Sequence, residues 1–305
     1  MNSGHSVFAP TGGCAEHYFT VMSDGDGDFP DQLSSLLGRY CAALEDRGLP
    51  LESGVWGTFY LSDAANCEHL LRAAPLFSRL RAVGMVLSVV QMPPSRGKIA
   101  LCAYHAQFSN GFQRRELVVN GLDESYNGVC TQTPSYELFY FKNMVSAHGG
   151  DAGDQTRVVF DALFEQCKAQ GLSQKNIIRT WIYVADIDNH YAAMSEARNA
   201  VFDANGLTAE GRFPASTGIS GRTKQAENRV MVDALVIKGL APQQIIPVDA
   251  LSHLNRTREY SVRFERALMV VYGDRSHLFI SGTASISPQG KILYEGNVLK
   301  QTQRV

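Results

Sequence analysis

Two stretches of the chain carry the same pattern of apolar and polar positions. In each, an Asp-Gln pair precedes apolar residues that recur at three- and four-residue spacing, which predicts an amphipathic helix. A Gly-Leu pair, a polar turn and a β-branched, aromatic run follow, GVWGTFYLSD in one stretch and IIRTWIYVAD in the other. Such runs are typical of buried strands. Gln32 and Asp63 are 31 residues apart, as are Gln155 and Asp186, which indicates an internal repeat.

The predicted helices begin and end at suitable residues. Asp31 and Asp154 lie at the helix starts, where a side-chain acceptor and a negative charge are stabilising. Gly48 and Gly171 lie at the ends, where glycine commonly stops a helix.

A second helix is predicted after the aromatic run of each stretch, and two more strands follow it. These are GMVLSVVQM and KIALCAYHA in the first, and ASTGISG and NRVMVDALVIKG in the second. We therefore predict tandem β-α-β-α-β-β units, an α+β fold with helices packed on one face of mixed sheets. Residues 1–125 form a divergent first unit and residues 126–241 a second unit.

Residues 242–305 resemble the opening hairpin of a third, incomplete unit, with Gln301 in the place of Gln32 and Gln155. By the same spacing, the aromatic strand of that unit would end near position 332. Three explanations are open: the chain is truncated, it self-associates as a homo-oligomer, or the first unit takes the hairpin as its own. We favour the third, which predicts that the 278–286 strand pairs with 16–22 or 55–61.

Composition narrows the function classes. Apolar residues make up 45% and charged residues 19% of the chain, as in ordinary globular proteins, and the net charge is −2 with no basic cluster. We therefore expect neither a nucleic-acid nor a membrane partner. The six cysteines are widely spaced and the N-terminus lacks the features of a signal peptide, which favours a cytoplasmic location. Histidine spacing does not suggest a metal site, and no nucleotide-binding glycine motif predicts a cofactor.

The repeated pattern resembles the Rid superfamily (reactive intermediate deaminases, also called the YjgF or endoribonuclease L-PSP family). The resemblance rests on FISGTASISPQGKILYEGNVLKQTQ, DQTRVVFDALFEQC, IIRTWIYVADIDNHYAAMSEARNAVF, RFPAST and NRVMVDALVIKG. It implies a ring of three units with small-molecule clefts at the unit boundaries, here in tandem form. It also implies hydrolysis of enamine or imine intermediates.

Two positions depart from that family. Its carboxylate-binding arginine lies in a Pro-Ala-Arg-Ser stretch, whereas this chain has Ser216 at the arginine position. An acidic residue near the start of the last strand is matched by Met231, with Asp233 two residues further on. Serine offers no charged bidentate contact, so a Rid-type reaction would need another cation. We leave open whether the chain is an enzyme, and we assign no catalytic residue.

A second resemblance is to the chorismatases, which share the fold and cleave the enolpyruvyl ether of chorismate. It rests on RTWIYVADI, FPASTGISG, RFERA and ISGTASI, in that order. Chorismatases usually have Trp-Asn-Tyr where this chain has Trp181-Ile182-Tyr183. Their acidic residue lies in the final strand of the last unit, a strand not in this sequence.

The candidate ligand is a small carboxylate-bearing metabolite at a cleft between units. A cleft with a buried arginine would support either enzyme class, whereas one plugged by Phe213 or Tyr136 would contradict both. A catalytically decayed binding or scaffold protein is the third possibility. The candidate binding residues are small, hydroxyl-bearing or cationic: Arg198, Ser216, Thr217, Arg266, Ser281, Gly282 and Thr283.

Overall fold

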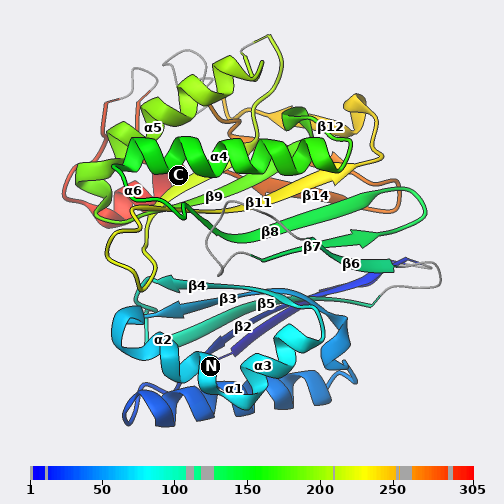
Figure 1. The fold of residues 1–305 in the computed structure, drawn as a ribbon, viewed down its shortest axis with the longest axis vertical. Helices are drawn as coiled ribbons and strands as arrows, with labels where there is room; N and C mark the ends of the chain where they lie inside the picture. The colour runs from blue at the N-terminus through cyan, green and yellow to red at the C-terminus, as the bar shows by residue number, and fades with distance from the viewer. Residues whose placement is uncertain are drawn as a thin grey trace.

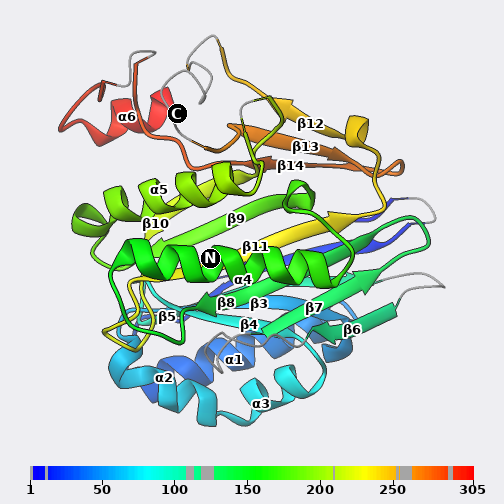
Figure 2. The ribbon, with the colours of Figure 1, turned by 45° about the horizontal axis from the view of Figure 1, so that its top comes forward.

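The structure is a computed structural model that describes residues 3–10, 13–107, 113–117, 127–208, 210–251, 254, 263–287 and 291–305. Two sheets lie with their helix-free faces toward each other, and helices cover their outer faces (Figure 1). A smaller third sheet lies beside the second (Figure 2). No helix in the described part of the chain is both long and apolar enough to span a membrane.

The first sheet has five strands in the order β1-β2-β5-β3-β4. The β3–β4 pair is parallel, and the other pairs are antiparallel. The strands are β1 (Ser3–Phe8), β2 (Ala15–Met22), β3 (Gly54–Leu61), β4 (Val86–Gln91) and β5 (Ile99–Gln107), and the helices are α1 (Phe29–Glu45), α2 (Ala64–Ala73) and α3 (Pro75–Ala82).

The second sheet repeats this topology with one strand added, in the order β10-β9-β11-β8-β7-β6. Its parallel pair is β9–β10. The shared order confirms the predicted α+β fold of tandem units. The strands are β6 (Gln113–Leu117), β7 (Asn127–Gln132), β8 (Glu137–Val145), β9 (Ile177–Val184), β10 (Ala215–Ser220) and β11 (Val230–Lys238), and the helices are α4 (Ala152–Ala169) and α5 (Ile187–Ala204).

The remainder forms a three-stranded antiparallel sheet and a short helix. Leu268 and Val270 of this sheet pack on Leu235 and Ile237 of β11, on the face of the second sheet opposite its helices. Helix α6 includes Gln301, as predicted. The elements are β12 (Ile245–Val248), β13 (Ala267–Val271), β14 (Ser276–Ile280) and α6 (Val298–Arg304).

The preferred explanation for the third part is wrong. Within the described residues, β14 pairs with β13 and not with β2 or β3. The first unit has its own hairpin, since β1 pairs with β2 and occupies the edge that the prediction left open. The short, polar segment 3–8 carries too weak a strand pattern to be recognised. Self-association stays a prediction.

The unit boundaries expected at 125 and 241 also stay predictions. The first lies outside the described residues, and β6, which precedes it, pairs within the second sheet. The second lies between the end of β11 and the start of β12.

The helix starts correct one detail of the sequence analysis. The N-caps are Asp28 and Asp151, whose side chains accept from the backbone N–H groups of Asp31 and Asp154. The two aspartates named from the sequence therefore lie in the first helical turn, where their charge is still favourable. Gly48 and Gly171 have φ of 60° and 69°, the left-handed conformation expected after a helix end.

The repeated glutamine ties each first helix to the start of the last strand of its unit. Gln155 is 1% exposed, and its amide bonds four backbone groups: it donates to Gly150 and Glu227 and accepts from Arg229 and Val230. Gln32 is 2% exposed. It donates to the Gly27 carbonyl and accepts from the Lys98 N–H and the Ser23 hydroxyl.

The first two sheets are joined by hydrogen bonds to a buried ion pair of the second sheet. Asp233, fully buried on β11, accepts from Lys142 Nζ at 2.7 Å and from the Asn143 N–H at 2.7 Å. From the first unit, Ser88 donates to the same carboxylate and Thr58 accepts from Lys142. Asn143 has φ of 58° beside a register shift between β8 and β11, and this irregularity turns its N–H toward Asp233.

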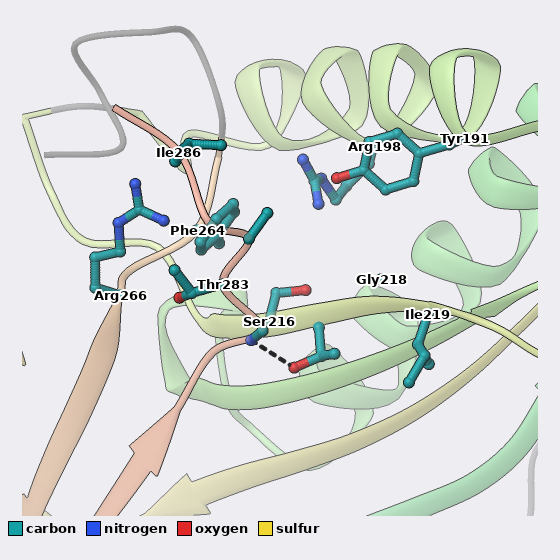
Figure 3. A pocket seen from close by; sticks show the side chains of 12 residues that line it. Tyr191, Arg198, Ser216, Gly218, Ile219, Phe264, Arg266, Thr283 and Ile286 are labelled. Atoms are coloured by element: carbon teal, nitrogen blue, oxygen red, sulfur yellow. Dashed lines mark hydrogen bonds between the residues drawn. The ribbon is translucent and has the colours of Figure 1, made fainter. Parts of the chain in front are cut away.

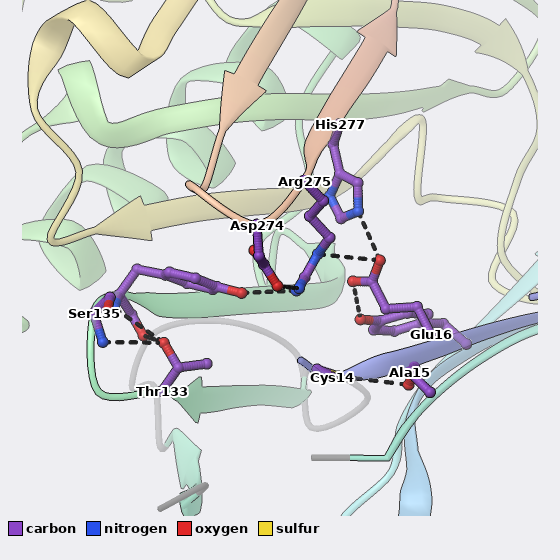
Figure 4. Close-up of polar contacts among 10 residues, drawn as sticks. Cys14, Ala15, Glu16, Thr133, Ser135, Asp274, Arg275 and His277 are labelled. Carbon is purple, nitrogen blue, oxygen red and sulfur yellow. Dashed lines mark hydrogen bonds and ion pairs between the residues drawn. The ribbon is translucent and has the colours of Figure 1, made fainter. Parts of the chain in front are cut away.

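A second buried cluster joins the first sheet to the β13–β14 hairpin (Figure 4). Glu16 of β2 accepts from the Tyr104 hydroxyl at 2.8 Å and lies 2.9 Å from His277 Nε2 and 3.4 Å from Arg275 Nε. Burial opposes ionisation of Glu16, but the hydrogen bonds and charges of His277 and Arg275 outweigh it and lower its pKa. Arg275 also donates to the Tyr136 hydroxyl. The third part is thus held to both units.

Replacing either buried glutamine should destabilise the protein more than replacing the third copy. Gln32→Leu removes a buried amide that bonds two backbone groups and Gln155→Leu one that bonds four, which costs on the order of 2–4 kcal/mol each. Gln301 makes one described side-chain bond, 3.4 Å from Nε2 to the Leu293 carbonyl, so Gln301→Leu is the matched control and should cost less than about 1 kcal/mol. Urea unfolding measures all three. Equal losses would contradict the structural role of the repeat.

Acid should destabilise the first unit through His105. This buried imidazole is hydrogen-bonded to Tyr40 and Ser53, and burial, aided by the charges of His17 and Arg114, lowers its pKa to about 3. The unfolded chain takes up this proton near pH 6.5 and the folded chain does not, so the contribution is complete above pH 6.5 and is lost as pH falls toward 3.

Between pH 7.5 and 4.5 this loss is on the order of 2–3 kcal/mol. His105→Asn should start less stable but lose less stability over the same interval, as measured by urea unfolding at both pH values. Parallel pH profiles would show that His105 is not the group responsible.

Candidate functional site

A pocket of about 440 Å³ lies where α5 and β10 of the second unit meet the segments before β13 and after β14 (Figure 3). It is therefore formed between the second unit and the third part. Its lining residues are Tyr191, Arg198, Ser216, Thr217, Gly218, Ile219, Phe264, Arg266, Gly282, Thr283, Ala284 and Ile286.

Hydrogen bonds close the seam between β10 and the segment after β14. The Ser216 N–H donates to Ser281 Oγ at 2.8 Å, and the Gly282 N–H donates to Thr217 Oγ1 at 2.8 Å. Ser281 Oγ donates in turn to the Glu265 carbonyl. A Cβ on Gly282 would lie 2.8 Å from Thr217 Cγ2, so the contact requires glycine at that position. These bonds set the position of Ser216, Thr217 and Gly282, which form the floor of the pocket.

Arg198 projects from α5 toward the pocket beside Tyr191 (Figure 3). The whole residue is 2% exposed, and burial lowers the pKa of its guanidinium. Nη2 donates to Ser195 Oγ and Asn199 Oδ1, both at 3.2 Å, while Nε has no partner among the described residues. No carboxylate among the described residues forms an ion pair with Arg198. A buried charge of this kind is costly unless a ligand pairs with it.

Arg266 supplies a second cation to the lining. It is 5% exposed, and its guanidinium lies 5.6 Å from the centre of the Phe264 ring. Burial lowers its pKa, and the charge of Asp249 partly offsets this effect. Figure 3 places Arg266 and Arg198 on opposite sides of the view, with Phe264 and Thr283 between them.

A third arginine lies directly behind the floor. Arg179 of β9 is 6% exposed, stacks 4.8 Å from the Trp181 ring centre and donates through Nη2 to Thr217 Oγ1. Burial lowers its pKa to about 10, so it stays charged at neutral pH. Arg179 was not among the candidates predicted from the sequence, although a single cation within the apolar run IIRTWIYV is a usable signal.

The structure brings the seven candidate residues together. Six of them line the pocket, and Ser281 lies directly behind, bonded to Ser216. Phe213 and Tyr136 do not plug it, because Phe213 stacks on Phe202 and Tyr136 packs on Tyr272. The apolar walls were missed, yet Tyr191 lies seven residues before Arg198, two turns away on the same helix face.

The two acidic positions weighed from the family pattern lie elsewhere. Met231 packs against Val90 and Tyr183, and Asp233 belongs to the buried ion pair between the sheets. The described lining residues include no carboxylate, imidazole or thiol, so their polar groups are hydroxyls, guanidinium groups and backbone. Within the described residues, no group of three His, Cys, Asp or Glu side chains could hold a metal ion.

The fold and the pocket define a tandem α+β protein with a cationic site at a unit boundary. The family model described as Endoribonuclease L-PSP matches residues 133–237, which confirms the resemblance of the second unit to the Rid/YjgF superfamily. No curated protein matches the chain by sequence.

Solved structures extend the likeness to the whole chain. A crystal structure of a chorismatase is similar over 98% of this chain and 76% of that chain, with 17% identity and a TM-score of 0.58. NMB1025, a YjgF protein family member from Neisseria meningitidis, matches 42% of this chain and 98% of its own, with 26% identity and a TM-score of 0.33. Rv2704 from Mycobacterium tuberculosis, of the YjgF/YER057c/UK114 family, matches 41% and 98%, with 18% identity and a TM-score of 0.32. The overall fold is thus shared with a chorismatase.

The two buried arginines Arg198 and Arg275 should respond oppositely to removal of their charge. Arg198→Met removes a charge that has no described counterion, so the free energy of unfolding should stay unchanged or rise by about 1–2 kcal/mol. Arg275→Met is the control: it breaks the pair with Glu16 and should cost about 3–5 kcal/mol. Urea unfolding without added anions tests both. A loss above about 2 kcal/mol for Arg198→Met would assign that arginine a structural role.

Proposed function

We propose that the chain binds a small carboxylate-bearing metabolite in the pocket between α5, β10 and the segment after β14. Arg198 carries the proposal, since it is charged, buried and without a described carboxylate partner at the pocket wall. A guanidinium matches a carboxylate with two parallel N–H···O bonds, and Arg266 adds positive charge to the same lining.

The rest of the lining favours a ligand with an apolar or unsaturated body. Tyr191, Ile219, Phe264 and Ile286 supply aromatic and aliphatic surface, and Thr283 adds a hydroxyl. A volume of about 440 Å³ lies within the range of small-molecule sites. Mostly apolar walls with a few charged donors bind the carboxylate end firmly and the remainder by burial.

The reaction that we propose for this site is Rid-like hydrolysis of an enamine or imine. Water adds to the imine carbon, the carbon–nitrogen bond breaks, and ammonia leaves behind a keto acid. Arg198 would replace the carboxylate-binding arginine that the family has at the position of Ser216. Because the described lining contributes no carboxylate or imidazole, its part is to bind and orient, while protons pass through water and hydroxyl groups.

A second candidate is chorismatase-like cleavage, favoured by the fold shared with a chorismatase along 98% of this chain. In that reaction the enolpyruvyl methylene takes a proton, water adds to the adjacent carbon, and the ether bond breaks to release pyruvate. Chorismate carries two carboxylates, which suits a pocket with two arginines. The protonating acid, however, is not among the described lining residues.

Binding and turnover distinguish these functions. Calorimetric titration with chorismate and with phenylpyruvate should show binding of at least one, weakened tenfold or more by Arg198→Met. Arg222→Met is the matched control, because Arg222 is exposed and outside the lining, and it should bind as the wild type does.

For turnover, faster ammonia release from 2-aminoacrylate supports the Rid-like reaction, and pyruvate release from chorismate supports the second candidate. Binding without either product identifies a binding protein. If neither ligand binds and neither product forms, the pocket is a remnant on a scaffold.

A further inference from the structure

The oxygen of the Thr217 hydroxyl already accepts two hydrogen bonds. A hydroxyl offers two lone pairs and one hydrogen. Thr217 Oγ1 accepts from Arg179 Nη2 on one side and from the Gly282 N–H, at 2.8 Å, on the other, the latter bond being drawn in Figure 3. Both lone pairs are therefore occupied, and among the described residues no acceptor takes the Thr217 hydrogen. Because Thr217 lines the pocket, this hydrogen is left for a ligand.

The strand pairing and a stacking contact position Arg179 to donate to the Thr217 hydroxyl. In the parallel β9–β10 pair it lies opposite Ala215, two residues before Thr217. Its guanidinium stacks on Trp181, and Lys142 lies 5.8 Å from the centre of the same ring. Nη1 has no partner among the described residues, and no described carboxylate pairs with Arg179. The hydroxyl is the one described hydrogen-bond acceptor for this buried cation, and a charged donor polarises its O–H bond.

Ser216 provides a contrast on the same strand. Its Oγ accepts from Thr180 Oγ1 at 2.8 Å, and no other described bond reaches this oxygen. One lone pair stays open, so Ser216 can either donate to or accept from a ligand. Thr217 Oγ1, with both lone pairs occupied, can only donate to a ligand.

We propose that Arg179 is a positioning residue that makes Thr217 Oγ1 an obligate hydrogen-bond donor, and that this donor selects carboxylates bearing a second acceptor oxygen. The selected class comprises keto acids, enol ethers and hydroxy acids that accept at this oxygen. A carboxylate with only a hydrocarbon body covers the Thr217 hydroxyl and leaves its hydrogen unpaired, which carries a desolvation cost. This inference rests on the proposed carboxylate site and deepens it.

The test uses two ligands that differ at one oxygen-bearing carbon. Phenylpyruvate carries a keto oxygen next to its carboxylate, and 3-phenylpropanoate has a methylene there. By calorimetric titration the wild type should prefer phenylpyruvate about tenfold, the size expected for one hydrogen bond to a donor that the bound ligand covers. Thr217→Val should abolish the preference, and Thr217→Ser should retain it.

The role of Arg179 is tested by the preference for phenylpyruvate over 3-phenylpropanoate, and not by affinity alone. Arg179→Met should reduce the preference several-fold and leave 3-phenylpropanoate binding nearly unchanged, whereas Arg179→Lys should restore part of it. In the Thr217→Val background, Arg179→Met should have no further effect on the preference, since the two residues act as one unit. Loss of both ligands in equal proportion, or an Arg179 effect that persists without the hydroxyl, overturns the inference.

The remaining outcomes separate this inference from the proposed function. Binding that depends on Arg198 but shows no keto preference overturns the inference and leaves the carboxylate site standing. If neither ligand binds the wild type while chorismate does, the inference fails and the carboxylate site stands. If chorismate does not bind either, the proposed function and the inference both fail. Should Arg179→Met not fold, the comparison of Thr217→Val with Thr217→Ser decides whether the hydroxyl selects for oxygen, and equal preferences in those two variants reject it.

Discussion

Burial of the inner sheet faces is the constraint on which the rest of the structure depends. Helices cover only one face of the first and second sheets, so the opposite faces must be buried against other strands. Val86 and Tyr104 pack with Val129 between the first two sheets, and Leu268 with Leu235 between the second and third. The three sheets therefore pack on one another through these faces.

Buried charged groups within these interfaces are of two kinds: some are paired within the protein and have a structural role, and others have no described counterion and can bind a ligand. Asp233 and Lys142 satisfy each other and are further bonded by Ser88 and Thr58 from the other unit. Such a satisfied pair adds specificity to the junction and leaves nothing for a ligand. Arg198 lines the pocket and has no counterion among the described residues. An unmet charge of this kind is tolerated where a ligand meets it, which is why the pocket and not the ion pair is the candidate site.

The extent to which the sequence predicts the fold follows from how local each signal is. The glutamine repeat was recognisable because each copy satisfies backbone groups close to its own helix and strand, so spacing and chemistry recur together. The cap aspartates were misplaced by three residues because Asp28 and Asp151 precede a second aspartate that also suits the first turn. The pairing of β14 was wrong because β1, a short polar strand, had filled the place assigned to it.

By itself, the amino-acid sequence determined the repeat, the unit topology and the residue types around a cleft, because periodicity and turn chemistry act over neighbouring residues. It also singled out Arg198, Ser216 and Gly282 as candidates, although no pattern says which of them touch. Only the tertiary structure decided that β10 meets a segment 65 residues further along the chain. That contact and the bond from Arg179 together occupy both lone pairs of Thr217 Oγ1. Only the structure shows that Arg198 is buried without a described counterion, since partners and burial depend on elements that are distant in sequence.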